Sequence, residues 1–143
     1  KWAKKPMNLI NAKYESLDIK PSFQDYETCV FVADGWFEWK KDSTGEKHPI
    51  FIHADQAVFY FAGIKNSYGA AIVTIDSHPS LANIHHRQSM FLDRLETSYW
   101  LKDRQKISSS NLLEKIKSYR VSKYVNSPIN NDQRCILETG IEQ

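Results

Sequence analysis

The chain has 143 residues, enough for one compact domain with a buried core, and we expect residues 1–143 to form a single domain. Hydrophobic residues make up 41% of the chain and charged residues 25%, which excludes a collagen-like or low-complexity protein. The apolar runs are far shorter than the ~20 residues of a bilayer span, so we expect no membrane span. The sequence shows no signal peptide, and its two cysteines have no ligand-like spacing. We therefore expect a cytoplasmic protein with reduced thiols.

The net charge of +2 is too small to indicate a partner, but basic residues gather toward the two ends. Residues 1–14 hold four basic residues and no acidic one, and residues 102–123 hold seven basic against two acidic. The stretch 14–101 carries twelve acidic and seven basic residues. Two basic stretches meeting on one face would follow a phosphate backbone, and the alternative is an ordinary solvated surface.

The first half of the chain predicts strands. A Pro-Ser pair favours a short helix start over residues 22–27, because serine caps free backbone amides. The unbroken apolar run 29–33 predicts a buried strand. After an Asp-Gly pair the residues alternate, which predicts a second strand with Trp36, Glu38 and Lys40 on one side.

A hairpin and two further strands follow in the middle of the chain. Turn residues at 42–45 and the returning strand 48–53 predict the hairpin, and residues 58–64 and 70–75 continue with aromatic and β-branched side chains. The late helices are predicted through Leu112, Leu113 and Ile116, with a capping-box-like Asn111 and Glu114, and more weakly over residues 97–101. This order predicts an α+β domain with a largely antiparallel sheet that closes toward a barrel, and a few short helices.

Glu38 and the run His85-His86-Arg87 are candidates for proton transfer. Apolar neighbours would desolvate the Glu38 carboxyl and favour its protonated form, which suits a general acid; the alternative is a solvent-facing glutamate paired with a lysine. A histidine in a loop after a strand can shuttle protons, and the arginine beside it can hold a phosphate, although histidines in loops are more often surface groups.

Other polar and aromatic residues allow two interpretations each. By itself, the local sequence around Asn11 indicates an asparagine in a turn. Trp2, Trp36 and Trp39 lie among lysines and either stack on unpaired bases or pack in the core. The histidines lack the spacing of a metal site, so we expect neither a metal nor a cofactor.

Four motifs in order resemble the SRAP domain, the SOS-response-associated peptidase family, over nearly the whole chain. They are Ile10-Asn11-Ala12-Lys13-Tyr14-Glu15-Ser16, Ala33-Asp34-Gly35-Trp36-Phe37-Glu38-Trp39-Lys40, Ile84-His85-His86-Arg87, and Val121-Ser122-Lys123 with Val125-Asn126. The resemblance implies a β-rich fold, binding of single-stranded DNA and capture of abasic sites in the DNA damage (SOS) response. We also expect a monomer that is associated with the nucleoid if the protein is bacterial.

The resemblance also implies roles for individual residues. Asn11 corresponds to the asparagine that hydrogen-bonds the adduct, Glu38 to the acid that positions an amine and shuttles protons, and His85 to the histidine that helps to open the sugar ring. Positions that contact DNA in the family correspond to Trp2, Lys13, Trp39, Thr74 and Arg87.

Covalent capture in the family uses an N-terminal cysteine, whose amine and thiol form a thiazolidine with the abasic aldehyde. Here the sequence begins at Lys1, and Cys29 and Cys135 offer no free α-amine. We therefore expect either the later portion of a longer or cleaved protein, or a single-stranded DNA-binding module that has lost crosslinking; general peptidase activity beyond self-processing is the third alternative. Lys13 replaces the usual arginine, which loses a forked phosphate contact.

Overall fold

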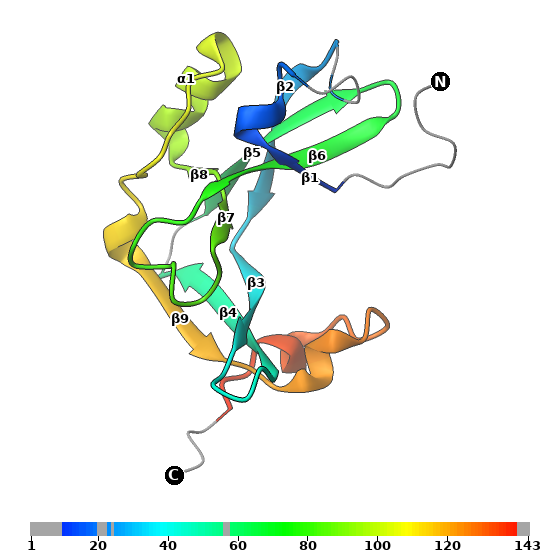
Figure 1. Ribbon diagram of the computed structural model, residues 1–143, viewed down its shortest axis with the longest axis vertical. Helices are drawn as coiled ribbons and strands as arrows, with labels where there is room; N and C mark the ends of the chain where they lie inside the picture. The colour runs from blue at the N-terminus through cyan, green and yellow to red at the C-terminus, as the bar shows by residue number, and fades with distance from the viewer. Residues whose placement is uncertain (1–9, 20–22, 24, 56–57, 140–143) are drawn as a thin grey trace.

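The chain folds into two β-sheets joined by one nearly continuous run of extended backbone. The computed structural model describes residues 10–19, 23, 25–55 and 58–139 (Figure 1). The larger sheet has the order β1-β6-β5-β2, with β7 paired to β6 and β8 to β5, and the smaller sheet has the order β3-β4-β9. The strands of the two sheets are β1 (Asn11–Lys13), β2 (Glu27–Ala33), β3 (Gly35–Lys41), β4 (Lys47–Ala54), β5 (Phe59–Asn66), β6 (Gly69–Asp76), β7 (Arg87–Ser89), β8 (Phe91–Leu92) and β9 (Ile116–Arg120).

Most strand pairs are antiparallel, and the fold is a β-rich α+β fold, as the sequence predicts. The parallel pair is β1 with β6, in which Lys13 lies opposite Thr74. The predicted hairpin is confirmed as β3 and β4, with Glu38 opposite Ile50. Gly35 starts β3 in a place without room for a side chain, because a Cβ there would lie 2.7 Å from the carbonyl oxygen of Ile52.

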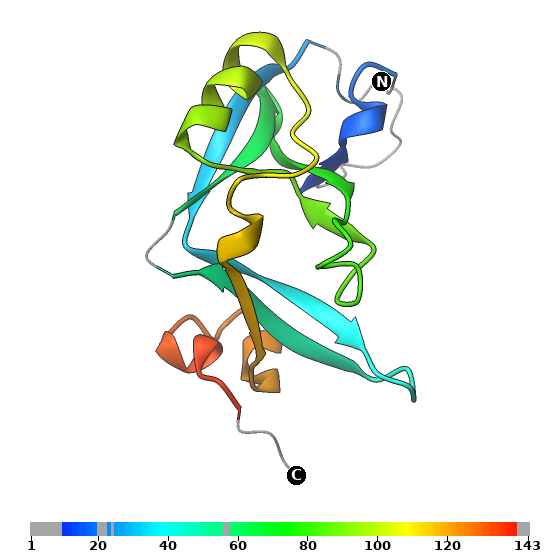
Figure 2. The same cartoon turned by 90° about the vertical axis from the view of Figure 1, so that its left-hand side faces the viewer.

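One α-helix, α1 (Arg94–Asp103), covers the larger sheet alongside β2 (Figure 2). Asp93 and Glu96 form a capping box at its start, which confirms the helix predicted over residues 97–101. Trp100 is fully buried and donates its indole N–H to the carbonyl oxygens of Cys29 and Gly63, at 3.0 and 3.2 Å. No helix among the described residues is long and apolar enough to cross a bilayer.

The predicted helix through Leu112, Leu113 and Ile116 is wrong. A short 3₁₀ turn, η3 (Leu113–Lys115), is followed at once by β9, and Ile116 pairs with Ala54 of β4. Strand pairing therefore overrides a local helical pattern. The helix start expected over residues 22–27 lies largely outside the described residues, and β2 already begins at Glu27.

The core lies in two clusters, and the second fixes the start of β3. Phe59, Phe61 and Phe91 of the larger sheet are buried in that cluster, and Trp36 packs edge-on against Phe59 with ring centroids 5.2 Å apart. Because Trp36 anchors β3 to the larger sheet, Glu38, two residues further along the same face, lies where the two sheets approach each other.

Candidate functional site

Glu38 and His85 come together between the two sheets. Oε2 of Glu38, on β3, lies 4.0 Å from Nδ1 of His85, which is in the loop between β6 and β7. The Glu38 side chain is 22% exposed, and this burial raises its pKa above the ordinary value, while the nearby His85 acts in the opposite direction. A half-buried carboxyl with a raised pKa beside an imidazole is an arrangement suited to proton transfer.

Hydrogen bonds to its own loop orient the His85 ring. Nδ1 lies 2.9 Å from the carbonyl oxygen of Arg87 and 3.2 Å from the Arg87 amide nitrogen. With the ring proton on Nδ1, His85 donates to the carbonyl oxygen, which is the shorter contact, and Nε2 keeps a free lone pair; in the other tautomer the Arg87 amide donates to Nδ1. His85 is 39% exposed, so Nε2 is available to a substrate while Glu38 lies on the Nδ1 side.

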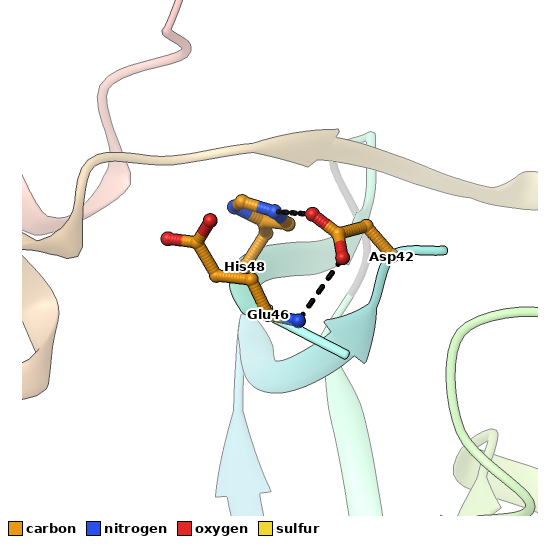
Figure 3. Close-up of side chains that lie close together, drawn as sticks. All are labelled: Asp42, Glu46 and His48. Carbon is orange, nitrogen blue, oxygen red and sulfur yellow. Dashed lines mark hydrogen bonds and ion pairs between the residues drawn. The ribbon is translucent and has the colours of Figure 1, made fainter. Parts of the chain in front are cut away.

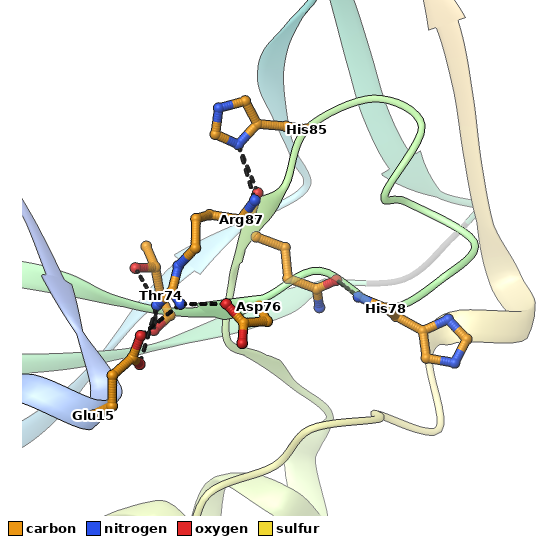
Figure 4. A network of polar contacts seen from close by, with 7 residues as sticks. Glu15, Thr74, Asp76, His78, His85 and Arg87 are labelled. Carbon is orange, nitrogen blue, oxygen red and sulfur yellow. Dashed lines mark hydrogen bonds and ion pairs between the residues drawn. The ribbon is translucent and has the colours of Figure 1, made fainter.

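The guanidinium group of Arg87 is the centre of a polar network (Figure 4). Nη1 donates to Oε1 of Glu15 and Oδ1 of Asp76, both at 2.7 Å, and Nη2 donates to Oε2 of Glu15 at 3.2 Å and to the carbonyl oxygen of Thr74 at 2.7 Å. The Arg87 side chain is 11% exposed. These hydrogen bonds lower the pKa of Glu15 and fasten the segment that carries His85 to β6 and to η1 (Tyr14–Ser16).

Asn11 and Lys13 lie on β1, the short edge strand of the larger sheet. Asn11 pairs with Ile72 and Lys13 with Thr74, so β6 stands between β1 and the segment of Arg87. Both side chains are exposed. Among the described residues, no hydrogen bond or ion pair joins Asn11 to Glu38 or His85, so its place in the site stays a prediction.

Two of the residues expected to contact DNA have neighbours that sequence reasoning did not foresee. Trp39 is 36% exposed and donates its indole N–H to Oδ1 of Asn126, at 2.8 Å, in η4 (Lys123–Asn126). The hydrogen bond fixes the ring while one part of it stays open to solvent. Thr74 is half-buried beside Arg87, and Trp2 lies outside the described residues. For the contact between Trp39 and Asn126, the sequence offered one signal, the presence of Asn126 in the last motif.

A small cavity borders the Glu38–His85 pair. Its polar lining comes from Trp36, Glu38, Ser77, His85, Arg87 and Gln88, and apolar side chains complete it. Gln88 is 5% exposed and accepts the backbone N–H of His78 at 2.8 Å, which fixes the start of the loop. Sequence reasoning missed Ser77 and Gln88, because nothing in their local pattern separates them from ordinary strand and loop residues.

Asp42, Glu46 and His48 form a cluster at the far end of the β3–β4 hairpin, away from this site (Figure 3). One ligand-type atom of each lies within 4.8 Å of the others. Protein groups engage them: Nε2 of His48 lies 2.7 Å from Asp42, Nδ1 of His48 accepts from Arg120 at 2.7 Å, and Glu46 pairs with Lys123. These contacts join the hairpin to β9 and η4, and we assign the cluster this structural role.

Comparison with known proteins gives a consistent result. A family model described as "SOS response associated peptidase (SRAP)" matches residues 1–128. The chain is 28% identical to "Abasic site processing protein YoqW" of Bacillus subtilis (strain 168), over 94% of this chain and 70% of that protein. It is 36% identical to "Abasic site processing protein YedK" of Escherichia coli (strain K12), over 79% of this chain.

The chain spans about half the length of some relatives, 54% for YedK and 52% for "Abasic site processing protein HMCES" of Pongo abelii, which is 28% identical. A solved structure of a protein from Bacteroides thetaiotaomicron superposes with a TM-score of 0.71 over 90% of this chain and 65% of that chain. At 23% identity this likeness shows that the fold is shared.

Proposed function

Because the chain belongs to the SOS response associated peptidase (SRAP) family, we propose that it processes abasic sites in DNA. Relatives that match most of the chain carry the name abasic site processing protein. The observation that carries the proposal is the 4.0 Å approach of Glu38 to His85, since the reaction needs proton transfer in a place where a sugar without a base can enter.

Glu38 and His85 are proposed to open the abasic sugar. Opening the cyclic hemiacetal removes a proton from the C1 hydroxyl and delivers one to the ring oxygen, so a base and an acid must flank the same ring. Nε2 of His85 has the free lone pair for the first transfer, and the raised pKa of Glu38 favours the protonated carboxyl for the second. Asn11 is proposed to hydrogen-bond the opened sugar.

The covalent step is proposed to follow the family's chemistry. An α-amine adds to the aldehyde carbon, water leaves to give an imine, and a neighbouring thiol adds to the imine carbon and closes a thiazolidine. This step needs an N-terminal cysteine, and Cys29 and Cys135 have backbone nitrogens that are already acylated. Burial also raises the pKa of the Cys29 thiol, which disfavours a thiolate nucleophile for general peptidase activity.

Single-stranded DNA is the proposed partner. Trp39 presents a fixed, partly exposed ring on which an unpaired base would stack, and Lys13 is an exposed cation on β1. Thr74 and Arg87 lie on the neighbouring strands, but a phosphate would reach the Arg87 guanidinium only by displacing a carboxylate such as Glu15. Trp2 remains a proposed contact from the sequence.

The second candidate is a single-stranded DNA-binding module without catalysis. One observation favours it, the Trp39 ring that Asn126 holds in place. The two functions separate in a binding assay that compares one oligonucleotide with and without a central abasic site. We expect the chain to prefer the abasic strand, in a noncovalent complex that denaturing electrophoresis dissociates. A form of the protein that begins with a cysteine is expected to give a heat-stable adduct. Equal affinity for both strands together with no adduct would leave the binding module as the function.

A further inference from the structure

Three residues that line the cavity beside Glu38 each carry a buried polar atom without a hydrogen-bond partner within the described part of the chain. The atoms are Nε1 of Trp36, Oγ of Ser77 and Nε of Arg87. Buried polar groups are nearly always hydrogen-bonded, and three exceptions around one cavity point to a common partner.

The chemistry of the lining selects that partner. The indole N–H of Trp36 and the Nε–H of Arg87 can donate but not accept, so they exclude a cation. Glu38 on the same lining disfavours an anion. A molecule that accepts two hydrogen bonds and donates two others fits the set, since Ser77 and Glu38 can accept.

The size of the cavity selects among such molecules. It leaves about 10 Å³ for the centre of a water-sized sphere, which is close to the space that a single buried water occupies. A water with two to four polar partners is the ordinary occupant of a site of this kind.

We propose that Trp36, Ser77 and Arg87 hold one internal water molecule that donates a hydrogen bond to the Glu38 carboxyl. Trp36 and Ser77 are thereby positioning residues for Glu38. The water joins the carboxyl to the network of Arg87, so that the acid and the segment bearing His85 are connected through polar contacts. Its effect on catalysis rests on the proposed function, but its presence does not.

Crystal structures of the wild-type protein and of Ser77 variants test the site without DNA. We expect density for a water within hydrogen-bond distance of Trp36 Nε1 and Arg87 Nε in the wild type. Ser77→Ala is the matched control, since it removes one partner but keeps the room, and the water should stay. Ser77→Val adds a methyl group to the cavity and should remove the water. If the valine variant does not fold, Ser77→Thr, which adds the same volume, is used in its place.

Titration of Glu38 by carboxyl carbon NMR supplies the second readout. The titratable group that faces this carboxyl is His85, and it is unchanged in every Ser77 variant. A water that donates to the carboxylate favours its charged form, so Glu38 should titrate at higher pH in Ser77→Val than in the wild type, with a smaller change in Ser77→Ala. Absence of the water from wild-type density, or the same Glu38 titration in the wild type and Ser77→Val, would overturn the proposal. Both readouts are independent of DNA, so a failure of abasic-site processing would be recognised separately.

Discussion

The guanidinium of Arg87 is held by both carboxylate oxygens of Glu15, at 2.7 and 3.2 Å. Asp76 binds the same group at 2.7 Å, and the arginine side chain is almost completely buried. Arg87 therefore joins η1, β6 and β7, and these hydrogen bonds hold the segment that carries His85 in place.

Loss of the hydrogen bonds made by Arg87 should destabilise the protein. We expect Arg87→Ala to lower the free energy of unfolding by about 1–3 kcal/mol, because the charge-assisted hydrogen bonds of a largely buried guanidinium are lost, including the one to the Thr74 carbonyl. Arg134→Ala, which breaks an exposed pair with Asp132, should lower the free energy of unfolding much less. Urea unfolding of both variants measures the difference. Equal losses would show that the Arg87 network contributes no more than a surface ion pair.

Glu38 should make the protein less stable at neutral pH. Burial raises its pKa in the folded state above the ordinary 4.5, so the folded protein binds this proton more tightly than the unfolded chain does. The stabilising contribution is complete below the unfolded pKa and is lost as the pH rises through the folded one. We expect Glu38→Gln to be more stable than the wild type at pH 7 and equally stable near pH 3.

Urea unfolding across this pH range tests the sign. Glu114→Gln, at an exposed position, is the matched control and should follow the wild type at every pH. A Glu38→Gln variant that is less stable than the wild type at neutral pH would contradict the account of a desolvated carboxyl.

The sequence predicts the central strands well, and physical reasons separate them from the elements that it misses. Strands β2 and β4 are long and strongly patterned, so their local signal suffices. Strands β1, β7 and β8 have two or three residues each, and no periodicity exists over such a length. Ile116 was misread because the pairing of β9 with β4 is a contact distant in sequence.

Glu96 links the only described α-helix to the segment that leads into β9. Its carboxylate accepts from the backbone of Asp93 at 2.8 Å, from Oγ of Ser110 at 2.6 Å and from the backbone of Asn111 at 3.0 Å. We expect Glu96→Gln to lower the free energy of unfolding by about 1–3 kcal/mol, because the amide oxygen replaces only one carboxylate oxygen and the amide nitrogen cannot accept the bonds made to the other. Thermal unfolding measures the loss, and a variant as stable as the wild type would show that the capping network is dispensable.

Trp39 should contribute to DNA binding through its exposed ring. Stacking is worth about 1–3 kcal/mol per base, so Trp39→Ala should weaken binding of a single-stranded oligonucleotide about fivefold or more. Asn126→Ala frees the ring and should weaken binding to a smaller extent. Tyr68→Ala, at the exposed end of the β5–β6 hairpin, should bind as the wild type does. Fluorescence anisotropy measures the affinity of each variant for the oligonucleotide. Equal losses of affinity in Trp39→Ala and Tyr68→Ala would refute a specific role for Trp39.

The candidate site is predictable in its residues but not in its geometry. Glu38 and His85 stand out through motif order, yet nothing local indicates that β3 of one sheet and a loop of the other bring them within 4.0 Å. Arg87 shows the opposite case, since its residue type indicates phosphate binding while the fold commits its guanidinium to Glu15 and Asp76. Tertiary contacts of this kind have no signature in a single sequence.

The central claim is that one proton-transfer unit, made of Glu38 and His85, acts on the abasic sugar. A double-mutant cycle tests it most directly, with the initial rate of covalent capture of an abasic single-stranded oligonucleotide measured for a form of the protein that begins with a cysteine. We predict that Glu38→Gln and His85→Ala each lower this rate by about a hundredfold or more, and that the double variant is no slower than the slower single one. Losses that multiply in the double variant, or single variants that react at the wild-type rate, would contradict the claim.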